Sequence, residues 1–273
     1  MSRFNSLSSK IQIGFASLVI PLSLLVGYFI YTQILGNPDN FVDQDPTKEP
    51  VLGNYLGVIH KGGYIVVLQI AFMVILLTYA IERFITIMRA KGRGSNLTFS
   101  QTIRSQVDKG AWQEAQATCD ERKGSVANVI RNGLGSFREI LDNNLIKREE
   151  RLSALKHEFD EATHLEIPIL HRNMSIISTL ASIATLVGLL GTVTGMIKAF
   201  AALASQGSAD AQALASGISQ ALVTTALGIS TAVVAIVIYN FFASRIDNII
   251  YQIEELSFSV VHALKVQLGL DEK

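Results

Sequence analysis

AQALASGISQALVTTALGISTAVVAIVIYNFFAS, residues 211–244, is the longest of four uncharged runs in this chain of 273 residues. The other three runs cover residues 11–35, 62–81 and 173–197. A hydrocarbon core about 30 Å thick needs about 20 helical residues, so each run can cross a membrane. Lipid offers the backbone no hydrogen-bond partners, so the runs must be helices. The sequence therefore predicts an all-α, polytopic membrane protein with four transmembrane helices.

The composition agrees with a membrane protein and excludes several other classes. Apolar residues make up 49% of the chain and charged residues 17%, compared with about 25% charged in soluble domains. The 23 basic and 23 acidic residues cancel, which argues against nucleic-acid binding. A single cysteine, Cys119, excludes a disulfide framework. The sequence lacks the GxxxxGK[ST], GxSxG and GxGxxG motifs, so we expect neither an enzyme nor a cofactor.

The basic residues that flank the runs predict the orientation in the membrane. The segment after the first run, residues 36–61, is mainly acidic, whereas five basic residues follow the second run: Arg83, Arg89, Lys91, Arg93 and Arg104. By the positive-inside rule, residues 90–171 and both termini are then cytoplasmic, and residues 36–61 face outward. The expected organisation is an anchor helix at 1–35, an outer loop at 36–61, a second transmembrane helix at 62–89, a cytoplasmic helical loop at 90–171, the third and fourth transmembrane helices at 172–243, and a cytoplasmic C-terminal helix at 244–273.

The first run could instead be a signal peptide, because Arg3 and Lys10 precede it. Its 25 residues exceed the apolar core of a typical signal peptide, which has about 7–15 residues, and no A-x-A-like site follows it. We therefore expect an uncleaved anchor, followed by a turn at residues 37–40.

Helix-breaking residues and apolar spacing predict the parts outside the spans. Gly124, Gly133 and Gly135 are expected to separate short helices in the loop, and Pro168 to interrupt the helix that leads into the third span. Beyond the fourth span, apolar residues recur at helical spacing: Ile246, Ile249, Ile250, Ile253, Leu256, Val260 and Leu264. The last helix should therefore continue well past the membrane.

The third and fourth runs are rich in Gly, Ala, Ser and Thr, which lets helix backbones approach closely. One face of the third run carries Thr185, Gly188, Thr192, Gly195 and Ala199, and Gly191 and Gly195 form a GxxxG pair. One face of the fourth run carries Gly217, Ala221, Thr225, Gly228 and Ala232. Such faces serve ordinary helix packing, with hydroxyl groups bonded to backbone carbonyls, or they line a narrow wet passage.

The segments Gly188-Leu-Leu-Gly-Thr-Val-Thr-Gly-Met, Gly217-Ile-Ser-Gln-Ala-Leu-Val-Thr-Thr-Ala-Leu-Gly-Ile and Val237-Ile-Tyr-Asn closely resemble the MotA/TolQ/ExbB proton-channel family, in particular its ExbB/TolQ branch. The resemblance implies a subunit of an energy-transducing motor in the bacterial inner membrane, which makes the 36–61 loop periplasmic. It also implies a ring of five copies around two copies of a single-span partner similar to ExbD or TolR, whose aspartate carries the proton. The resemblance further implies a TonB-like protein as a partner. Four spans rather than the three usual for ExbB suggest an added N-terminal helix.

The resemblance also assigns roles to individual residues. Thr192 and Thr225 match pore threonines of the family, and Gln220 replaces its usual glutamate on the proton path. Thr185 stands where the branch often has proline. The expected packing glycines are Gly188, Gly191, Gly195 and Gly228.

The charges of the spans lead independently to a partner chain. A proton path through lipid needs a titratable group, and neither the third nor the fourth run contains Asp, Glu or His. Threonine hydroxyls orient water but do not hold a proton charge near neutral pH. Lys198 is expected at the outer interface. If the protein conducts protons, the carboxylate must therefore come from another chain.

Three other hypotheses compete with a channel subunit. His157, His164 and His171, with Glu161, recur on one helix face as in a metal site, but no second cluster completes such a site and we expect no metal. A secondary transporter would more often show inverted repeats and broken helices. A passive scaffold would share the packing faces without needing Thr192 and Thr225.

Overall fold

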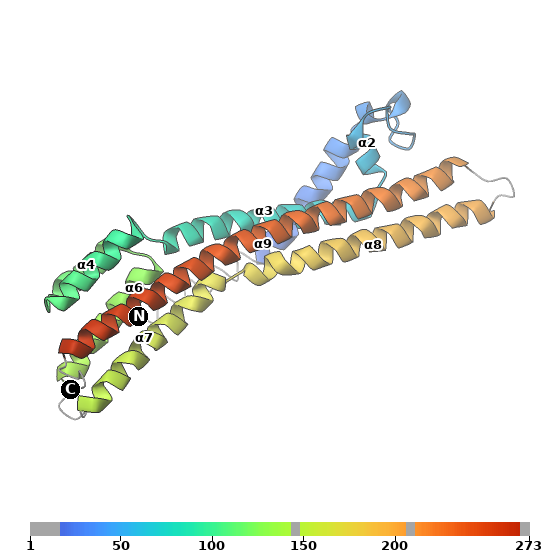
Figure 1. Ribbon diagram of the computed structural model, residues 1–273. Helices are drawn as coiled ribbons and strands as arrows, with labels where there is room; N and C mark the ends of the chain where they lie inside the picture. The colour runs from blue at the N-terminus through green and yellow to red at the C-terminus, as the bar shows by residue number, and fades with distance from the viewer. Residues whose placement is uncertain (1–16, 143–147, 206–210, 268–273) are drawn as a thin grey trace. The chain divides into compact units, whose positions relative to one another are not determined.

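The computed structural model describes residues 17–142, 148–205 and 211–267 (Figure 1). Within these ranges the chain is helical, apart from turns and one isolated β-bridge between Phe41 and Pro50. Four helical stretches are long and apolar enough to span a membrane: Ser17–Leu35, Tyr64–Ala90, Glu150–Ala204 and Ala211–Val266. The predicted all-α fold with four spanning helices is confirmed. The chain divides into two compact units, each formed by two separate segments.

The first unit comprises Met1–Ile81 and Ser175–Tyr239. Its described part begins with a helix that ends in a π-helical turn, η1 (Ile30–Leu35), and continues through two 3₁₀ turns, η2 (Pro38–Asn40) and η3 (Val42–Gln44), to α2 (Tyr55–His60). It also contains most of α3 (Tyr64–Ala90) and of α8 (Met174–Ser205), and the first half of α9 (Ala211–Gln267). Asn37 caps η2 through its side chain, so the predicted turn at residues 37–40 is confirmed.

The segment between the first two spans is a structured cap. Asn40 is buried and donates to the carbonyl oxygens of Ile34 and Leu35 at 2.8 and 3.0 Å. Asn54, which caps α2, donates to the Asn40 side chain at 2.9 Å. The His60 ring stacks on the Tyr31 ring, with centroids 4.5 Å apart. Buried polar groups of this segment therefore satisfy one another, as burial requires.

The second unit comprises Glu82–Met174 and Asn240–Lys273. It holds α4 (Asn96–Asp108), α5 (Trp112–Arg122), α6 (Ser125–Asp142) and α7 (Arg148–His171), with the ends of α3 and α9. Six of the seven residues of the apolar stripe expected after residue 244 are at most 5% exposed, and Ile250 is partly exposed. The six are Ile246, Ile249, Ile253, Leu256, Val260 and Leu264. The expected continuation of the last helix is confirmed, since α9 is one helix of 57 residues.

Two expected helix breaks are wrong. Helix α6 passes through Gly133 and Gly135 without interruption. Gly133 lies against the Phe159 ring of α7, and a β-carbon at this position would overlap the ring, so the glycine serves close packing. Pro168 lies inside α7, which continues to His171. The break before α8 is made instead by Asn173, whose φ of 57° lies in the left-handed region.

A buried ion pair links the charged end of α3 to this break. Arg83 is 1% exposed and donates to both carboxylate oxygens of Glu82, at 2.7 and 2.6 Å. It also donates to the Leu170 carbonyl oxygen at 3.3 Å. Glu82 accepts further bonds from Thr86 and Asn173. The two charges are thus paired and hydrogen-bonded, the condition under which charges tolerate burial.

Candidate functional site

The candidate site lies in the first unit, where α8 and α9 pack through their small residues. A β-carbon on Gly195 would lie 2.6 Å from the Gly217 carbonyl oxygen, and one on Gly228 would lie 2.6 Å from that of Ala184. Gly188 faces Gly228, with 3.3 Å between its added β-carbon and the Gly228 α-carbon. The two backbones are therefore nearly in contact along this seam, which any side chain larger than hydrogen would separate at Gly195 or Gly228.

Gly191 also lies on the seam. It faces the Thr224 side chain of α9, which fills the space that a β-carbon would take. The four glycines expected to pack helices thus all lie between α8 and α9 of one chain.

Thr192 and Thr225 meet in the middle of the seam. Their hydroxyl groups are hydrogen-bonded to each other, and both side chains are half-buried. The Thr225 hydroxyl is also 3.0 Å from the Ala221 carbonyl oxygen, and the Thr192 hydroxyl 3.4 Å from that of Gly188. Each hydroxyl has one proton and two lone pairs, so the pair retains the capacity to bind a water molecule.

Gln220 is buried on α9, and its side-chain oxygen accepts a hydrogen bond from the Lys198 amine at 2.9 Å. Lys198 is itself exposed on α8. A neutral amide thus occupies the position that the resemblance assigns to a carboxylate, and a cation lies beside it. No protonatable acid is present at this position.

Sequence reasoning missed a third polar residue, Gln69 of α3. This side chain is 2% exposed and donates from its nitrogen to the Thr224 carbonyl oxygen at 2.6 Å. Its own oxygen is buried and has no hydrogen-bond partner in the described part of the chain. The available signal was that Gln69 is the only amide in the apolar run at residues 62–81. The bond ties α3 to α9 beside the threonine pair.

An open groove of about 420 Å³ lies farther along the same two helices. Ser178, Ser182 and Thr185 line it from α8, and Ala232, Ile236 and Tyr239 line it from α9. Thr185 is exposed there and bonds to the Ala181 carbonyl oxygen at 3.3 Å, within an unbroken helix. The groove offers hydroxyl groups and no charge.

Titratable groups are scarce in the described parts of α8 and α9 within this unit. Lys198 is the one charged residue in 175–205 and 211–239. In the three described ranges of the whole chain, no group of three His, Cys, Asp or Glu residues is placed to hold a metal ion. The arrangement can orient water and exclude lipid, but it does not itself carry a proton charge.

Known proteins are similar in sequence to the part of the chain that contains the seam. Residues 125–255 match the sequence model of the MotA/TolQ/ExbB proton channel family. A putative biopolymer transport protein ExbB homolog of Methanothermobacter thermautotrophicus is 29% identical over 76% of this chain and 70% of its own length. The Tol-Pal system protein TolQ of Haemophilus influenzae is 27% identical over 72% of this chain and 87% of its own. The biopolymer transport protein ExbB of Pseudomonas putida is 34% identical over 54% of this chain and 47% of its own.

Proposed function

Because the chain belongs to the MotA/TolQ/ExbB proton channel family and is of its ExbB/TolQ type, we propose that it is the ExbB-like subunit of a proton-driven motor in a bacterial inner membrane. In this proposal a homo-oligomer, a ring of five copies, surrounds a single-span partner similar to ExbD or TolR. The motor energises TonB-type transport across the outer membrane. Both termini of the subunit are cytoplasmic, in line with the basic residues after the second span.

The paired hydroxyl groups of Thr192 and Thr225 are the observation that carries this proposal. They lie together on the close-packed seam and are half-buried, so they can hold a water molecule on the side that faces away from the seam. Neither group stores a proton. The acid therefore comes from the partner's aspartate, and the role of this chain is to orient water next to it.

The lack of an acid at position 220 supports the proposal that the partner supplies the acid and this chain orients the water. Gln220 accepts a hydrogen bond from the Lys198 amine, so the local charge is positive. A positive charge favours the ionised form of a nearby carboxylate. We propose that Lys198 and Gln220 act in this way on the partner's aspartate, and that the chain itself has no catalytic group.

A TolQ-like role in envelope integrity is the second candidate. It is favoured by the match to TolQ of Haemophilus influenzae, which extends over 87% of that protein. Co-purification from the native membrane separates the two candidates, because the single-span partner recovered would resemble either ExbD or TolR. Recovery without any single-span protein would favour a passive scaffold.

Valine substitution tests the water-orienting role. Thr192→Val and Thr225→Val keep the side-chain shape and remove the hydroxyl. In a complex reconstituted with its partner, we expect proton flux to fall about two- to thirteenfold for each variant, since a single hydrogen bond is worth about 0.5–1.5 kcal/mol. The oligomer should persist, because polar contacts in bilayers average about 0.6 kcal/mol.

Thr231→Val is the matched control. Thr231 is 3% exposed and donates to the Leu227 carbonyl oxygen at 3.0 Å, so the variant loses a backbone hydrogen bond of the same kind in a buried position. Its proton flux should equal that of the unmodified protein. Unchanged flux in both Thr192→Val and Thr225→Val would show that these residues only pack.

A further inference from the structure

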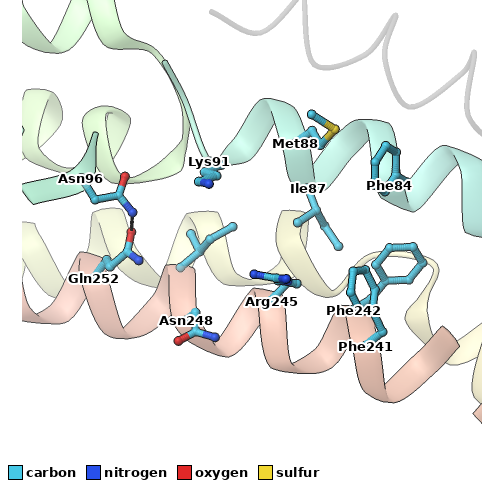
Figure 2. A pocket seen from close by; sticks show the side chains of 11 residues that line it. Phe84, Ile87, Met88, Lys91, Asn96, Phe241, Phe242, Arg245, Asn248 and Gln252 are labelled. Carbon is cyan, nitrogen blue, oxygen red and sulfur yellow. Dashed lines mark hydrogen bonds between the residues drawn. The ribbon is translucent and has the colours of Figure 1, made fainter. Parts of the chain in front are cut away.

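A cavity of about 570 Å³ lies in the second unit between the end of α3 and the middle of α9 (Figure 2). Its lining changes along its length. Phe84 and Phe241 lie at one end, Lys91 and Arg245 come next, and Asn96 and Gln252 lie at the other end, hydrogen-bonded to each other. The order is therefore aromatic, cationic and then polar. Phe84, Met88 and Phe241 are each about half exposed, at 50, 60 and 49%, so an apolar surface is available to a ligand.

The cavity has positive charge without compensation. No carboxylate is among the residues that line it. Within the described ranges, neither Lys91 nor Arg245 forms an ion pair, and the Arg245 guanidinium lies 5.3 Å from the centre of the Phe241 ring. An anion placed here would meet two cations and no repelling group.

A second cavity, of about 540 Å³, adjoins the first through Met88 and extends the positive surface. Four basic residues line it, again without a carboxylate: Arg89, Arg93, Arg122 and Lys123. Arg122 is 6% exposed, and its Nε and Nη1 have no hydrogen-bond partner in the described chain. The end of α3 is thus flanked by basic side chains on both sides.

The cavity also lies where both helices change from apolar to charged. The uncharged run of α3 ends at Ile81, and that of α9 ends at Ser244. From Phe84 to Lys91 an α-helix rises about 10 Å. The polar layer on each side of a bilayer is about 5–8 Å thick. When Lys91 lies among the lipid headgroups, Phe84 therefore lies a few ångströms inside the hydrocarbon.

We propose that this cavity is a binding site for one anionic phospholipid. The acyl chain lies against Phe84, Met88 and Phe241, and the phosphate group is held by Lys91 and Arg245. A lipid matches the cavity better than a soluble anion does, because its acyl chain can cover the exposed aromatic side chains, whereas a soluble anion would leave them in contact with water. The site does not depend on whether the protein conducts protons.

Native mass spectrometry of the full-length protein tests this site. Protein stripped of lipid in detergent is incubated with phosphatidylglycerol or with phosphatidylcholine of the same acyl chains. We expect retention of phosphatidylglycerol and little retention of phosphatidylcholine. In the double variant Lys91→Gln/Arg245→Gln, phosphatidylglycerol should bind about 30-fold more weakly, since each basic residue at an anionic surface contributes about fivefold.

Two variants and one competitor make the result specific. Lys109→Gln/Lys265→Gln removes the same charge from positions outside both cavities and should bind as the unmodified protein does. Lys91→Arg/Arg245→Lys keeps the charge and should also retain the lipid. Equal retention of the two lipids, equal loss in the Lys109/Lys265 variant, or displacement of phosphatidylglycerol by millimolar inorganic phosphate would each overturn the proposal.

Discussion

Gly195→Ala should destabilise the packing of α8 on α9, whereas Gly188→Ala should be tolerated. The two glycines lie on the same face of α8, two turns apart. A β-carbon at position 195 would lie 2.6 Å from the Gly217 carbonyl oxygen and 2.8 Å from the Ala221 amide nitrogen. At position 188 its nearest neighbour is the Thr224 carbonyl oxygen at 3.2 Å. Both glycines face backbone atoms, which cannot rotate away, but only at Gly195 would the added β-carbon lie closer than 3.0 Å to them.

The magnitude follows from the separation that the new atom requires. Ordinary contact begins at about 3.4 Å, so Gly195→Ala must move the helices apart by about 0.8 Å, and Gly188→Ala by about 0.2 Å. Overpacking of this kind costs about 1–3 kcal/mol. The helix propensity gained by replacing Gly with Ala, about 1 kcal/mol, is the same in both variants and cancels in the comparison. We therefore expect Gly195→Ala to be about 1–3 kcal/mol less stable than Gly188→Ala.

Reversible unfolding in mixed detergent micelles, followed by circular dichroism, measures this difference. The unmodified protein gives the reference, and Gly135→Ala, at a helical glycine whose added β-carbon would lie 3.7 Å from its nearest neighbour, reports the change in helix propensity without overpacking. Equal stability of Gly195→Ala and Gly188→Ala would refute the close approach of the two backbones.

Three further predictions concern charged and titratable groups outside the seam. Arg83→Met should cost about 3–5 kcal/mol of unfolding free energy because it leaves Glu82 without its buried partner, and Glu82→Gln added to it should recover part of this loss in the same unfolding assay. Burial raises the pKa of the Cys119 thiol to about 12, so maleimide at pH 7 should label Cys119 at least about 100-fold more slowly in the folded protein than in denaturant, as mass spectrometry can show. Burial lowers the pKa of His60, so the folded state binds a proton at this imidazole less well than the unfolded state does. The melting temperature should therefore fall as the pH drops below about 6.5, and His60→Gln should remove the contribution of this group to that pH dependence.

The sequence was sufficient to predict the fold because charge is costly in lipid. Four uncharged runs leave few alternatives to four helices, and the periodic isoleucines after Ser244 predict the buried stripe of α9. Helix ends inside the loop were harder. A glycine inside an amphipathic segment can end a helix or can let an aromatic ring pack closely against the helix. At Gly133 the second role applies because of Phe159, which lies 26 residues away in the chain. Local sequence rules therefore could not predict that the helix continues through Gly133.

Part of the candidate site could be predicted from the spacing of small residues in the sequence. Small residues at helical spacing place Thr192 and Thr225 on faces of two neighbouring spans, and the structure brings their hydroxyl groups into contact. Gln69 could not be assigned, because its partner is the backbone carbonyl of Thr224, 155 residues away. A carbonyl group has no sequence signature, so only the folded chain reveals the pair.

Charged and neutral polar groups lie at different places along the spanning helices. Where α3 turns from apolar to charged, Glu82 and Arg83 neutralise each other, and both form further hydrogen bonds. In the α8–α9 seam the polar groups are hydroxyls and amides, and Lys198 is the one cation in the described part. An acid that belonged to this chain and was buried in the seam would be removed from water, and its burial would favour the protonated form. A carboxylate that must release protons is therefore better placed on a separate chain, as we propose for this subunit and its partner.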